Sequence, residues 1–159
     1  MTALVIDGLS VAKTVRAECR RRVDDLLTSA GVRPGLAVLN VGDDPASALY
    51  IRNKIKACVE VGIKSVPAYF DRDCDPQRVI DTIVQFNGDP SIHGILVQLP
   101  LPPQFQIGPV LRAINPDKDV DGFHLYNVGA LVVGDMIFPP CTPYGVVRLL
   151  EHEGISLAG

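Results

Sequence analysis

The sequence predicts an α/β protein in which helices cover both faces of a mainly parallel sheet. Three short apolar segments, each suited to a buried strand, alternate along the chain with segments of helical periodicity. Strands joined through helices form right-handed crossovers, which place the strands parallel to one another. The 159 residues suit one domain, and 47% hydrophobic residues supply a core. We therefore expect a three-layer α/β/α fold.

The first half of the chain is expected to contain two helices around one buried strand. Ser10 is placed to cap an amphipathic helix that ends at Gly31. The apolar run 35–41 follows Pro34 and precedes a Gly-Asp-Asp-Pro turn, which indicates a buried strand. In the next helix, Asp44 is the expected N-cap, and Gly62 is the expected left-handed stop.

The second half continues the alternation of strands and helices. Residues 63–70 predict a strand, and Pro67 within it indicates a sheet edge or an irregularity. The remaining expected elements are a helix from Asp75-Pro76 to residues 87–88, a strand over 92–99, a helix over 107–114, an ordered loop over 117–127, and a last helix from Thr142-Pro143 to Gly154.

The helix after Asp44 carries two stripes of side chains. An apolar stripe is expected to face the core, and it consists of Ala48, Ile51, Ile55, Cys58 and Val59. A second stripe, Ser47, Tyr50 and Lys54, lies about a quarter turn away, at the rim of the core. A lysine amine that is partly removed from water becomes available for acid–base chemistry. An ordinary solvated polar flank is the alternative interpretation.

Composition excludes several classes of protein. A net charge of −3 and a pI near 5.5 argue against nucleic acid or an anionic membrane as a partner. The four cysteines form no CxxC pair and have no histidine at a metal-ligand spacing, so we expect reduced thiols, no metal and a cytoplasmic protein. No basic leader precedes a long apolar run, and no run approaches the ~20 residues of a membrane span.

Other candidate ligand contacts lie near the carboxyl ends of the expected strands, where open α/β sheets bind ligands. Gln98 offers an amide that donates and accepts, and the prolines after it stiffen the backbone into a wall for a flat ligand. Asp121 can accept two N–H groups from an amino-heterocycle, and the alternative is a turn-stabilising side chain with Gly122 in the left-handed region. No glycine-rich dinucleotide fingerprint or P-loop is present.

Several longer motifs, taken together, resemble one family. They are IDG at 6–8, VGDDPAS at 41–47, YIRNK at 50–54, KACVEVGI at 56–63, GILVQLPLP at 94–102, PDKDVDGFH at 116–124, YNVG at 126–129 and PCTPYG at 140–145. With these motifs, the chain resembles the amino-terminal part of the bifunctional methylenetetrahydrofolate dehydrogenase/methenyltetrahydrofolate cyclohydrolase family. The motifs stand in the family's order over nearly the whole chain. Departures from the family pattern at Leu125 and Ala130 concern local loop shape.

The resemblance implies a folate enzyme. Such enzymes oxidise 5,10-methylenetetrahydrofolate with NADP and hydrolyse the methenyl product to 10-formyltetrahydrofolate, and they are usually homodimers. By position, Lys54 matches the essential lysine, Tyr50 the tyrosine that stacks on the folate, and Gln98 the glutamine that holds the lysine. Asp121 matches the aspartate at the pterin end, and Ser47 lies beside the lysine. The expected substrate wall is formed by Pro100, Leu101 and Pro102.

The resemblance also implies domain limits. Residues 1–140 would form the folate-binding catalytic domain, and residues 141–159 a connecting helix. In the family this helix leads to a Rossmann domain that binds NADP, and this chain contains no such domain, so we expect a fragment. Two alternatives remain: a folate-binding lobe without dehydrogenase activity, and a receiver-like domain in which Asp43 and Asp44 take Mg²⁺ and a phosphoryl group.

Overall fold

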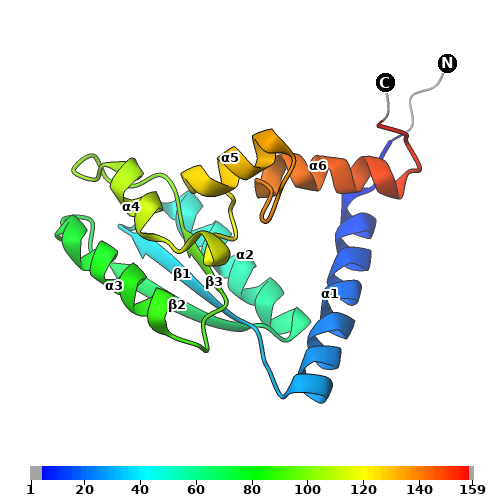
Figure 1. The fold of residues 1–159 in the computed structure, drawn as a ribbon, viewed down its shortest axis with the longest axis horizontal. Helices are drawn as coiled ribbons and strands as arrows, with labels where there is room; N and C mark the ends of the chain where they lie inside the picture. The colour runs from blue at the N-terminus through cyan, green and yellow to red at the C-terminus, as the bar shows by residue number, and fades with distance from the viewer. Residues whose placement is uncertain (1–4, 158–159) are drawn as a thin grey trace.

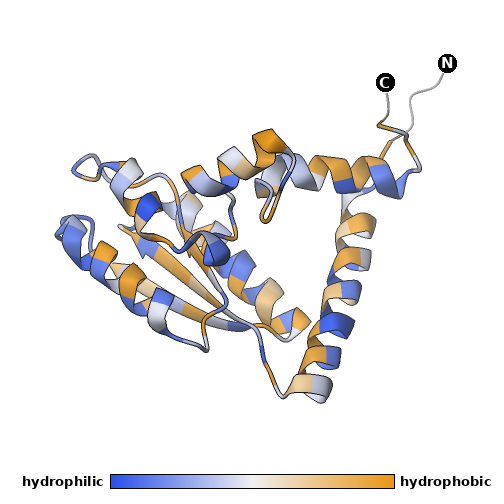
Figure 2. Ribbon diagram, viewed as in Figure 1, coloured by the Kyte–Doolittle hydropathy of each residue, from blue (hydrophilic) through white to orange (hydrophobic). Residues whose placement is uncertain are grey.

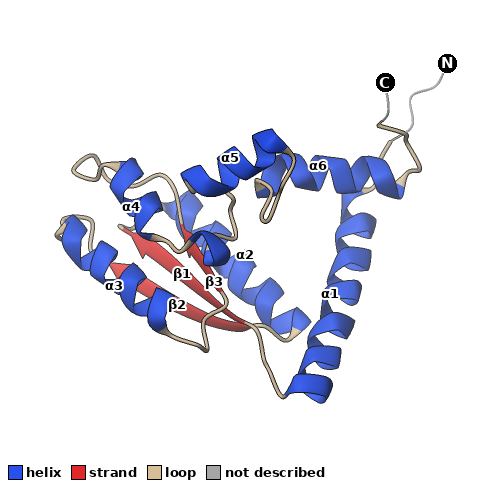
Figure 3. Cartoon of the chain, in the orientation of Figure 1, coloured by secondary structure: helices blue, strands red, loops and turns tan. Residues whose placement is uncertain are grey.

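The computed structural model describes residues 5–157 and contains a small sheet surrounded by helices (Figures 1 and 3). Residues 1–4 and 158–159, the outer limits of the expected domains, lie outside the described residues. In chain order, the elements are α1 (Gly8–Ala30), β1 (Gly35–Val41), α2 (Pro45–Val61), β2 (Lys64–Phe70), α3 (Pro76–Gly88), β3 (Gly94–Val97), α4 (Ile107–Ala113), the 3-10 helix η1 (Pro116–Lys118), α5 (Leu125–Val133) and α6 (Cys141–His152).

The sheet has the strand order β2-β1-β3, and both pairings are parallel. This confirms the expected parallel sheet. β1 is the central strand, with Val38 opposite Pro67 of β2 on one side and Leu96 of β3 on the other. Pro67 therefore lies on an edge strand of this sheet, as predicted, because proline cannot donate to a second neighbour.

Each face of the sheet is covered by helices, which confirms the three-layer arrangement. On one face, Leu39 of β1 and Ile95 of β3 pack with Ile83 of α3 and Val110 of α4 in the larger core. On the other face, Val38 and Leu96 pack against Ile51 of α2. The four residues of β3 are all buried, and Figure 2 shows the apolar colour concentrated along the strands.

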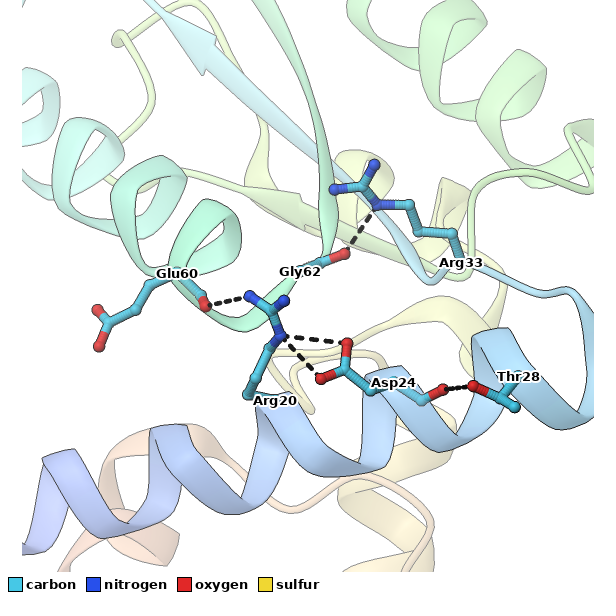
Figure 4. A network of polar contacts seen from close by, with 6 residues as sticks. All are labelled: Arg20, Asp24, Thr28, Arg33, Glu60 and Gly62. Atoms are coloured by element: carbon cyan, nitrogen blue, oxygen red, sulfur yellow. Dashed lines mark hydrogen bonds and ion pairs between the residues drawn. The ribbon is translucent and has the colours of Figure 1, made fainter.

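Helix α1 lies apart from the sheet and contacts α2 near its carboxyl end (Figure 1). Arg20 Nη1 donates to the Glu60 carbonyl at 3.3 Å, and its Nε pairs with Asp24 one turn along α1. Arg33, in the connection after α1, donates from Nε to the Gly62 carbonyl at 2.8 Å (Figure 4). Two arginines thus satisfy carbonyls at the carboxyl end of α2 that have no partner within the helix.

Helix α6 joins this arrangement from the opposite end of the chain. Arg148 of α6 lies 3.7 Å from Glu18 of α1, and it also pairs with Glu151 within α6. No residue of α6 is fully buried. The carboxyl-terminal helix is therefore held to the domain mainly by partly exposed contacts.

Several expected element boundaries were wrong. Helix α1 is capped by Asp7 rather than Ser10, because the Asp7 carboxylate accepts the N–H groups of Leu9 and Ser10. Helix α6 begins at Cys141, one residue before the expected Thr142. The predicted strand over 92–99 is shortened to Gly94–Val97. The expected loop over 117–127 includes part of η1 and the start of α5, a helix that the sequence analysis did not foresee.

Candidate active site

Helix α2 positions the candidate lysine, and its ends are those that the sequence predicts. The Asp44 carboxylate accepts the Ser47 N–H at 2.8 Å, Pro45 occupies the first turn, and Gly62 adopts φ +85° at the C-cap. Within the expected apolar stripe, Ile51 and Cys58 are buried. Val59 is 68% exposed, so its place on that stripe was wrong, and Val61 is buried instead.

A cleft of about 620 Å³ opens beside α2 at the carboxyl end of β3. We call it the Lys54 cleft. It brings together four of the predicted site residues: Tyr50, Lys54, Gln98 and Asp121. Its other lining residues are Leu36, Ala57, Cys58, Leu96, Val97, Leu99, Val120, Phe123, Cys141 and Thr142. A predominantly apolar wall with a few convergent polar groups suits a flat organic ligand.

Lys54 and Gln98 meet inside this cleft. Lys54 Nζ donates to Gln98 Oε1 at 3.3 Å, although 44 positions separate the two residues along the chain. Gln98 is itself fixed, since its Nε2 donates to the Leu99 carbonyl at 2.8 Å and its backbone N–H to the Leu39 carbonyl at 2.9 Å. The amide oxygen is therefore held toward the lysine, which leaves the rest of the amine free to face a ligand.

Tyr50 and Asp121 define two further sides of the cleft. The Tyr50 side chain is 63% exposed, which leaves a ring face open for stacking. Asp121 follows η1 in a loop that packs closely on β3. A Cβ added at Gly94 would lie 2.5 Å from Val120 Cγ1, so the absence of a side chain at Gly94 lets this loop approach the strand. Gly122 adopts φ +69°, which lies in the left-handed region that glycine occupies without strain.

Asp119, and not Asp121, is the carboxylate that stabilises the turn. Asp119 is 1% exposed, and its Oδ2 accepts the His124 N–H at 2.8 Å and Asn127 Nδ2 at 2.9 Å. Lys118 likewise supports the loop by donating to three carbonyl groups at the end of α3, those of Phe86, Asn87 and Asp89. These contacts hold the turn, and they leave Asp121 to line the cleft.

The electrostatics of the cleft are set by Asp121, Cys141 and Lys54. Burial raises the pKa of the Asp121 carboxyl, and the positive charge of Lys54 opposes that rise. Burial also raises the pKa of the Cys141 thiol, and the negative charge of Asp121 raises it further. The thiol donates to the Val120 carbonyl at 3.1 Å. Cys141 is therefore a neutral donor beside a carboxyl group near neutral pH.

The remaining predicted site residues lie elsewhere. Ser47 is 5% exposed at the start of α2, so little of it is open to a ligand. The predicted wall residues Pro100, Leu101 and Pro102 line a neighbouring hollow and not the Lys54 cleft. The sequence analysis missed Cys141, Phe123 and Thr142 as cleft residues. For Cys141 and Thr142, the available signal was the PCTPYG motif, which carries both.

Two polar residues outside the cleft have structural roles. His124 caps α5 by accepting the Tyr126 N–H on Nδ1. Asp44, part of the receiver-like alternative, uses its carboxylate as the α2 cap. Among residues 5–157, no group of three or more histidine, cysteine or acidic side chains is arranged to hold a metal ion. Within the same residues, no helix is both long and apolar enough for a membrane span.

Fold and cleft together define an α/β domain with an enzyme-like cleft at the carboxyl ends of parallel strands. Comparison with known proteins specifies the family. The family model for the tetrahydrofolate dehydrogenase/cyclohydrolase catalytic domain matches residues 6–121. The chain belongs to the tetrahydrofolate dehydrogenase/cyclohydrolase family.

Individual relatives agree with this assignment. The bifunctional protein FolD of Nitrosospira multiformis is 54% identical over 159 residues, which are 100% of this chain and 55% of the relative. The crystal structure of the bifunctional enzyme FolD from Campylobacter jejuni has a TM-score of 0.94 and 41% identity over 98% of this chain and 55% of that one.

A FolD structure from Trypanosoma brucei, complexed with NADP cofactor and inhibitor, has a TM-score of 0.94 and 32% identity, and the match covers 100% of this chain and 55% of that one. This chain thus spans about half the length of the relatives and structures that it matches.

Proposed function

We propose that the Lys54 cleft binds a tetrahydrofolate substrate and that the protein hydrolyses 5,10-methenyltetrahydrofolate to 10-formyltetrahydrofolate. The observation that carries this proposal is the contact of Lys54 Nζ with Gln98 Oε1 at 3.3 Å, in a cleft that Tyr50 and Asp121 also line. The name of the family, tetrahydrofolate dehydrogenase/cyclohydrolase, supports both this hydrolysis and the preceding oxidation of the methylene form.

Each cleft residue has a role in substrate binding. The exposed ring of Tyr50 stacks on the flat part of the folate. Asp121 accepts N–H groups of the pterin when it is ionised, because a carboxylate takes paired donors in fork geometry. Leu36 and Leu96 add apolar surface to the same cleft. The substrate is thereby held across the amine of Lys54.

The hydrolysis needs proton transfer at two atoms. Water bonds to the bridging carbon of the methenyl cation and gives up a proton, which the Lys54 amine can accept after releasing its own proton. The bond from this carbon to one ring nitrogen then breaks, that nitrogen receives the proton back from Lys54, and the hydroxyl group left on the carbon releases its proton to solvent as the formyl C=O forms. Gln98 fixes the amine through its amide oxygen and so aligns it with both atoms. Lys54 is the catalytic residue, and Gln98 is its positioning residue.

For the oxidation, we propose NADP as the hydride acceptor, as the Trypanosoma brucei complex suggests. The described residues of this chain do not fit its pyrophosphate. The turn after β1 carries the carboxylates Asp43 and Asp44, which repel phosphate groups. We therefore propose that this chain binds the folate substrate. NADP would be bound by residues other than 5–157.

The wider setting follows from the same assignment. We propose that residues 1–140 form the folate-binding catalytic domain and residues 141–159 the connection to the NADP-binding part of the whole protein. We also propose a homodimer that acts in the cytoplasm and supplies 10-formyltetrahydrofolate for purine biosynthesis. Family membership is the support for these statements.

The decisive test is Lys54→Met in the whole protein. We expect cyclohydrolase turnover to fall by at least about 100-fold, since general acid–base groups contribute roughly that much. Lys56→Met is the matched control, because Lys56 lies on the same helix with an exposed side chain. Circular dichroism and urea unfolding check the fold. Retained cyclohydrolase turnover in a folded Lys54→Met protein would contradict the proposal.

A further inference from the structure

Two buried polar side chains, Asp119 and Asn127, contact each other beside the loop that carries Asp121. Asp119 is 1% exposed and Asn127 is 0% exposed, and neither lines the Lys54 cleft. Asn127 Nδ2 donates to Asp119 Oδ2 at 2.9 Å, so the residue after η1 is tied to the first turn of α5. We call these two residues the Asp119–Asn127 pair.

The pair is costly in free energy. Within residues 5–157, Asp119 has no ion-pair partner, and a buried carboxylate without a cation is unfavourable. Among the same residues, Asn127 Oδ1 is buried without a hydrogen-bond partner, which costs about 1–3 kcal/mol. Two apolar side chains of similar size would avoid both costs. The pair is therefore poorly explained by stability alone.

The hydrogen bonds of the pair fix the shape of the loop. Asp119 Oδ2 also accepts the His124 N–H at 2.8 Å, and the Asp119 carbonyl accepts the Gly122 N–H at 3.3 Å. Asn127 Nδ2 donates to the Pro116 carbonyl at 3.0 Å as well. One carboxylate thus holds the two ends of the segment 119–124, and the asparagine holds that carboxylate.

The segment 119–124 carries two kinds of ligand contact into the Lys54 cleft. It contributes the carboxyl group of Asp121 and the ring of Phe123, which is 43% exposed. Lys54 and Gln98 lie on α2 and after β3, and they hold each other through a hydrogen bond that does not involve this segment. The amine and the binding groups opposite it therefore have separate supports.

We propose that the Asp119–Asn127 pair positions Asp121 and Phe123 for substrate binding. This proposal rests on the proposed function, in which Asp121 accepts N–H groups of the pterin. Paired donors require a carboxylate in a fixed orientation, and the closed segment 119–124 supplies it. Asp119 and Asn127 are positioning residues, because they act on the substrate only through the segment that they hold.

The charge of Asp119 gives the pair a second effect, on the ionisation of Asp121. The groups that face Asp121 are Lys54 from α2, Asp119 from the same segment and Cys141 from α6. Burial raises the pKa of Asp121, the charge of Lys54 lowers it, the negative charge of Asp119 raises it, and the hydrogen bond with Cys141 lowers it. Only ionised Asp121 accepts two N–H donors. Removing the charge of Asp119 should therefore extend substrate binding to lower pH.

The first test is Asn127→Ala in the whole protein, which removes both hydrogen bonds of Nδ2. Calorimetry should show about tenfold weaker binding of 5-formyltetrahydrofolate, a loss of about 1.4 kcal/mol. In cyclohydrolase assays, KM should rise by a similar factor while kcat changes by less than about twofold, since Lys54 and Gln98 keep their contact.

Val79→Ala is the matched control for lost stability. Val79 lies on α3 and is 0% exposed in the larger core, on the other face of the sheet from α2. Its truncation destabilises the domain without changing a contact of the segment 119–124. Val79→Ala should therefore bind 5-formyltetrahydrofolate as the unmodified protein does, with urea unfolding used to compare the stability of the two variants.

The second test is Asp119→Asn, which removes the charge and keeps an oxygen that can accept the N–H groups of His124 and Asn127. Calorimetry with 5-formyltetrahydrofolate from about pH 5 to about pH 8 follows the ionisation of Asp121. The acid limit of binding should lie at lower pH than in the unmodified protein. This measurement also decides if Asn127→Ala does not fold.

The outcomes separate the two proposals. If the unmodified protein does not bind 5-formyltetrahydrofolate, the proposed folate function fails. If it binds this ligand and Asn127→Ala binds it equally well, the folate function stands and the positioning role is refuted. Equal losses of affinity in Asn127→Ala and Val79→Ala refute the positioning role too. An acid limit that is the same in Asp119→Asn refutes the effect of Asp119 on Asp121.

Discussion

Asp121 makes the stability of the domain depend on pH. Burial raises the pKa of its carboxyl in the fold above the unfolded value, so the folded chain binds more protons in the window between the two values. The stabilisation from the protonated carboxyl is complete below about pH 4, the ordinary pKa of an aspartate, and is lost as pH rises through the raised value.

Asp121→Asn should remove this dependence. We expect the free energy of unfolding of the variant, relative to the unmodified chain, to increase as pH rises from about 4 toward neutrality. Urea unfolding at several pH values measures it. Parallel curves for the two proteins would show that Asp121 titrates as it does in the unfolded chain.

The same substitution should change the reactivity of Cys141. The charge of Asp121 raises the pKa of the Cys141 thiol, and only the thiolate is alkylated. In Asp121→Asn, iodoacetamide should therefore modify Cys141 faster at pH 8.5. Partly exposed Cys19, on α1, is the internal control, with modification of each cysteine followed by mass spectrometry. An unchanged Cys141 rate would contradict this coupling.

The sequence predicted the chemical role of single residues better than it predicted which cavity their side chains face. The strand-end position of Gln98 and the helical spacing of Tyr50 and Lys54 indicated a shared site, and these side chains line one cleft. Pro100 follows Gln98 by only two positions, yet it faces the neighbouring hollow. Sequence spacing does not show on which side of a turning loop a side chain lies.

At the scale of elements, the arginine contacts at the end of α2 should be measurable. Arg33→Ala removes the donor to the Gly62 carbonyl, and we expect a loss of about 1 kcal/mol in the free energy of unfolding. Arg21→Ala is the matched control, because Arg21 pairs only with Asp25 within α1, and it should cost less than about 0.5 kcal/mol. If urea unfolding gave the two variants the same loss in free energy of unfolding, the Arg33–Gly62 contact would contribute no more to stability than the surface ion pair of Arg21.

The loop that carries Asp121 should depend strongly on Gly122. A Cβ there would lie 2.6 Å from the Phe138 carbonyl oxygen, and φ is +69°. Gly122→Ala should cost roughly 2–5 kcal/mol from backbone strain and overpacking. Gly134 has a similar φ of +82° but no atom within 4 Å of an added Cβ, so Gly134→Ala should cost only about 1–2 kcal/mol. Similar unfolding free energies for the two variants would contradict the close packing at Gly122.

Elements with strong end signals were predicted well, and those without were not. Helix α3 begins after Asp75 and ends at Gly88, as proposed from its cap and its Asn-Gly end. Helix α5 was missed because its N-cap is His124, a weak signal, inside a polar and turn-rich segment. Helix α1 was started too late because Asp7 and Ser10 are both good capping residues, and only the structure shows which one accepts the N–H groups.

For the whole molecule, the fold predicts a gradient of stability. β1 pairs on both sides and has Leu39 fully buried, whereas α6 has no buried residue. In native-state hydrogen exchange, the amides of β1 should be the slowest and those of α6 among the fastest. Exchange from β1 as fast as from α6 would mean that the sheet is not the stable core.

The layered architecture followed from the alternation of apolar segments and helices, because parallel strands require helical crossovers. The strand order did not follow. The segments 35–41 and 92–99 are both continuous apolar runs, so periodicity alone could not show that β1 occupies the centre between β2 and β3. That order depends on contacts between residues far apart in the chain.

The bare backbone at Gly94 has a practical consequence for anyone mapping this protein by mutation. A side chain there would place its Cβ 2.5 Å from Val120 Cγ1, so Val120 would have to shift, and Asp121 is the next residue in the chain. A screen scored by turnover alone would then rank Gly94 beside the reacting groups, although it lies in the buried strand β3. Assays of protein abundance run in parallel would not correct the error if the altered chain still folds, whereas a structure of the variant would.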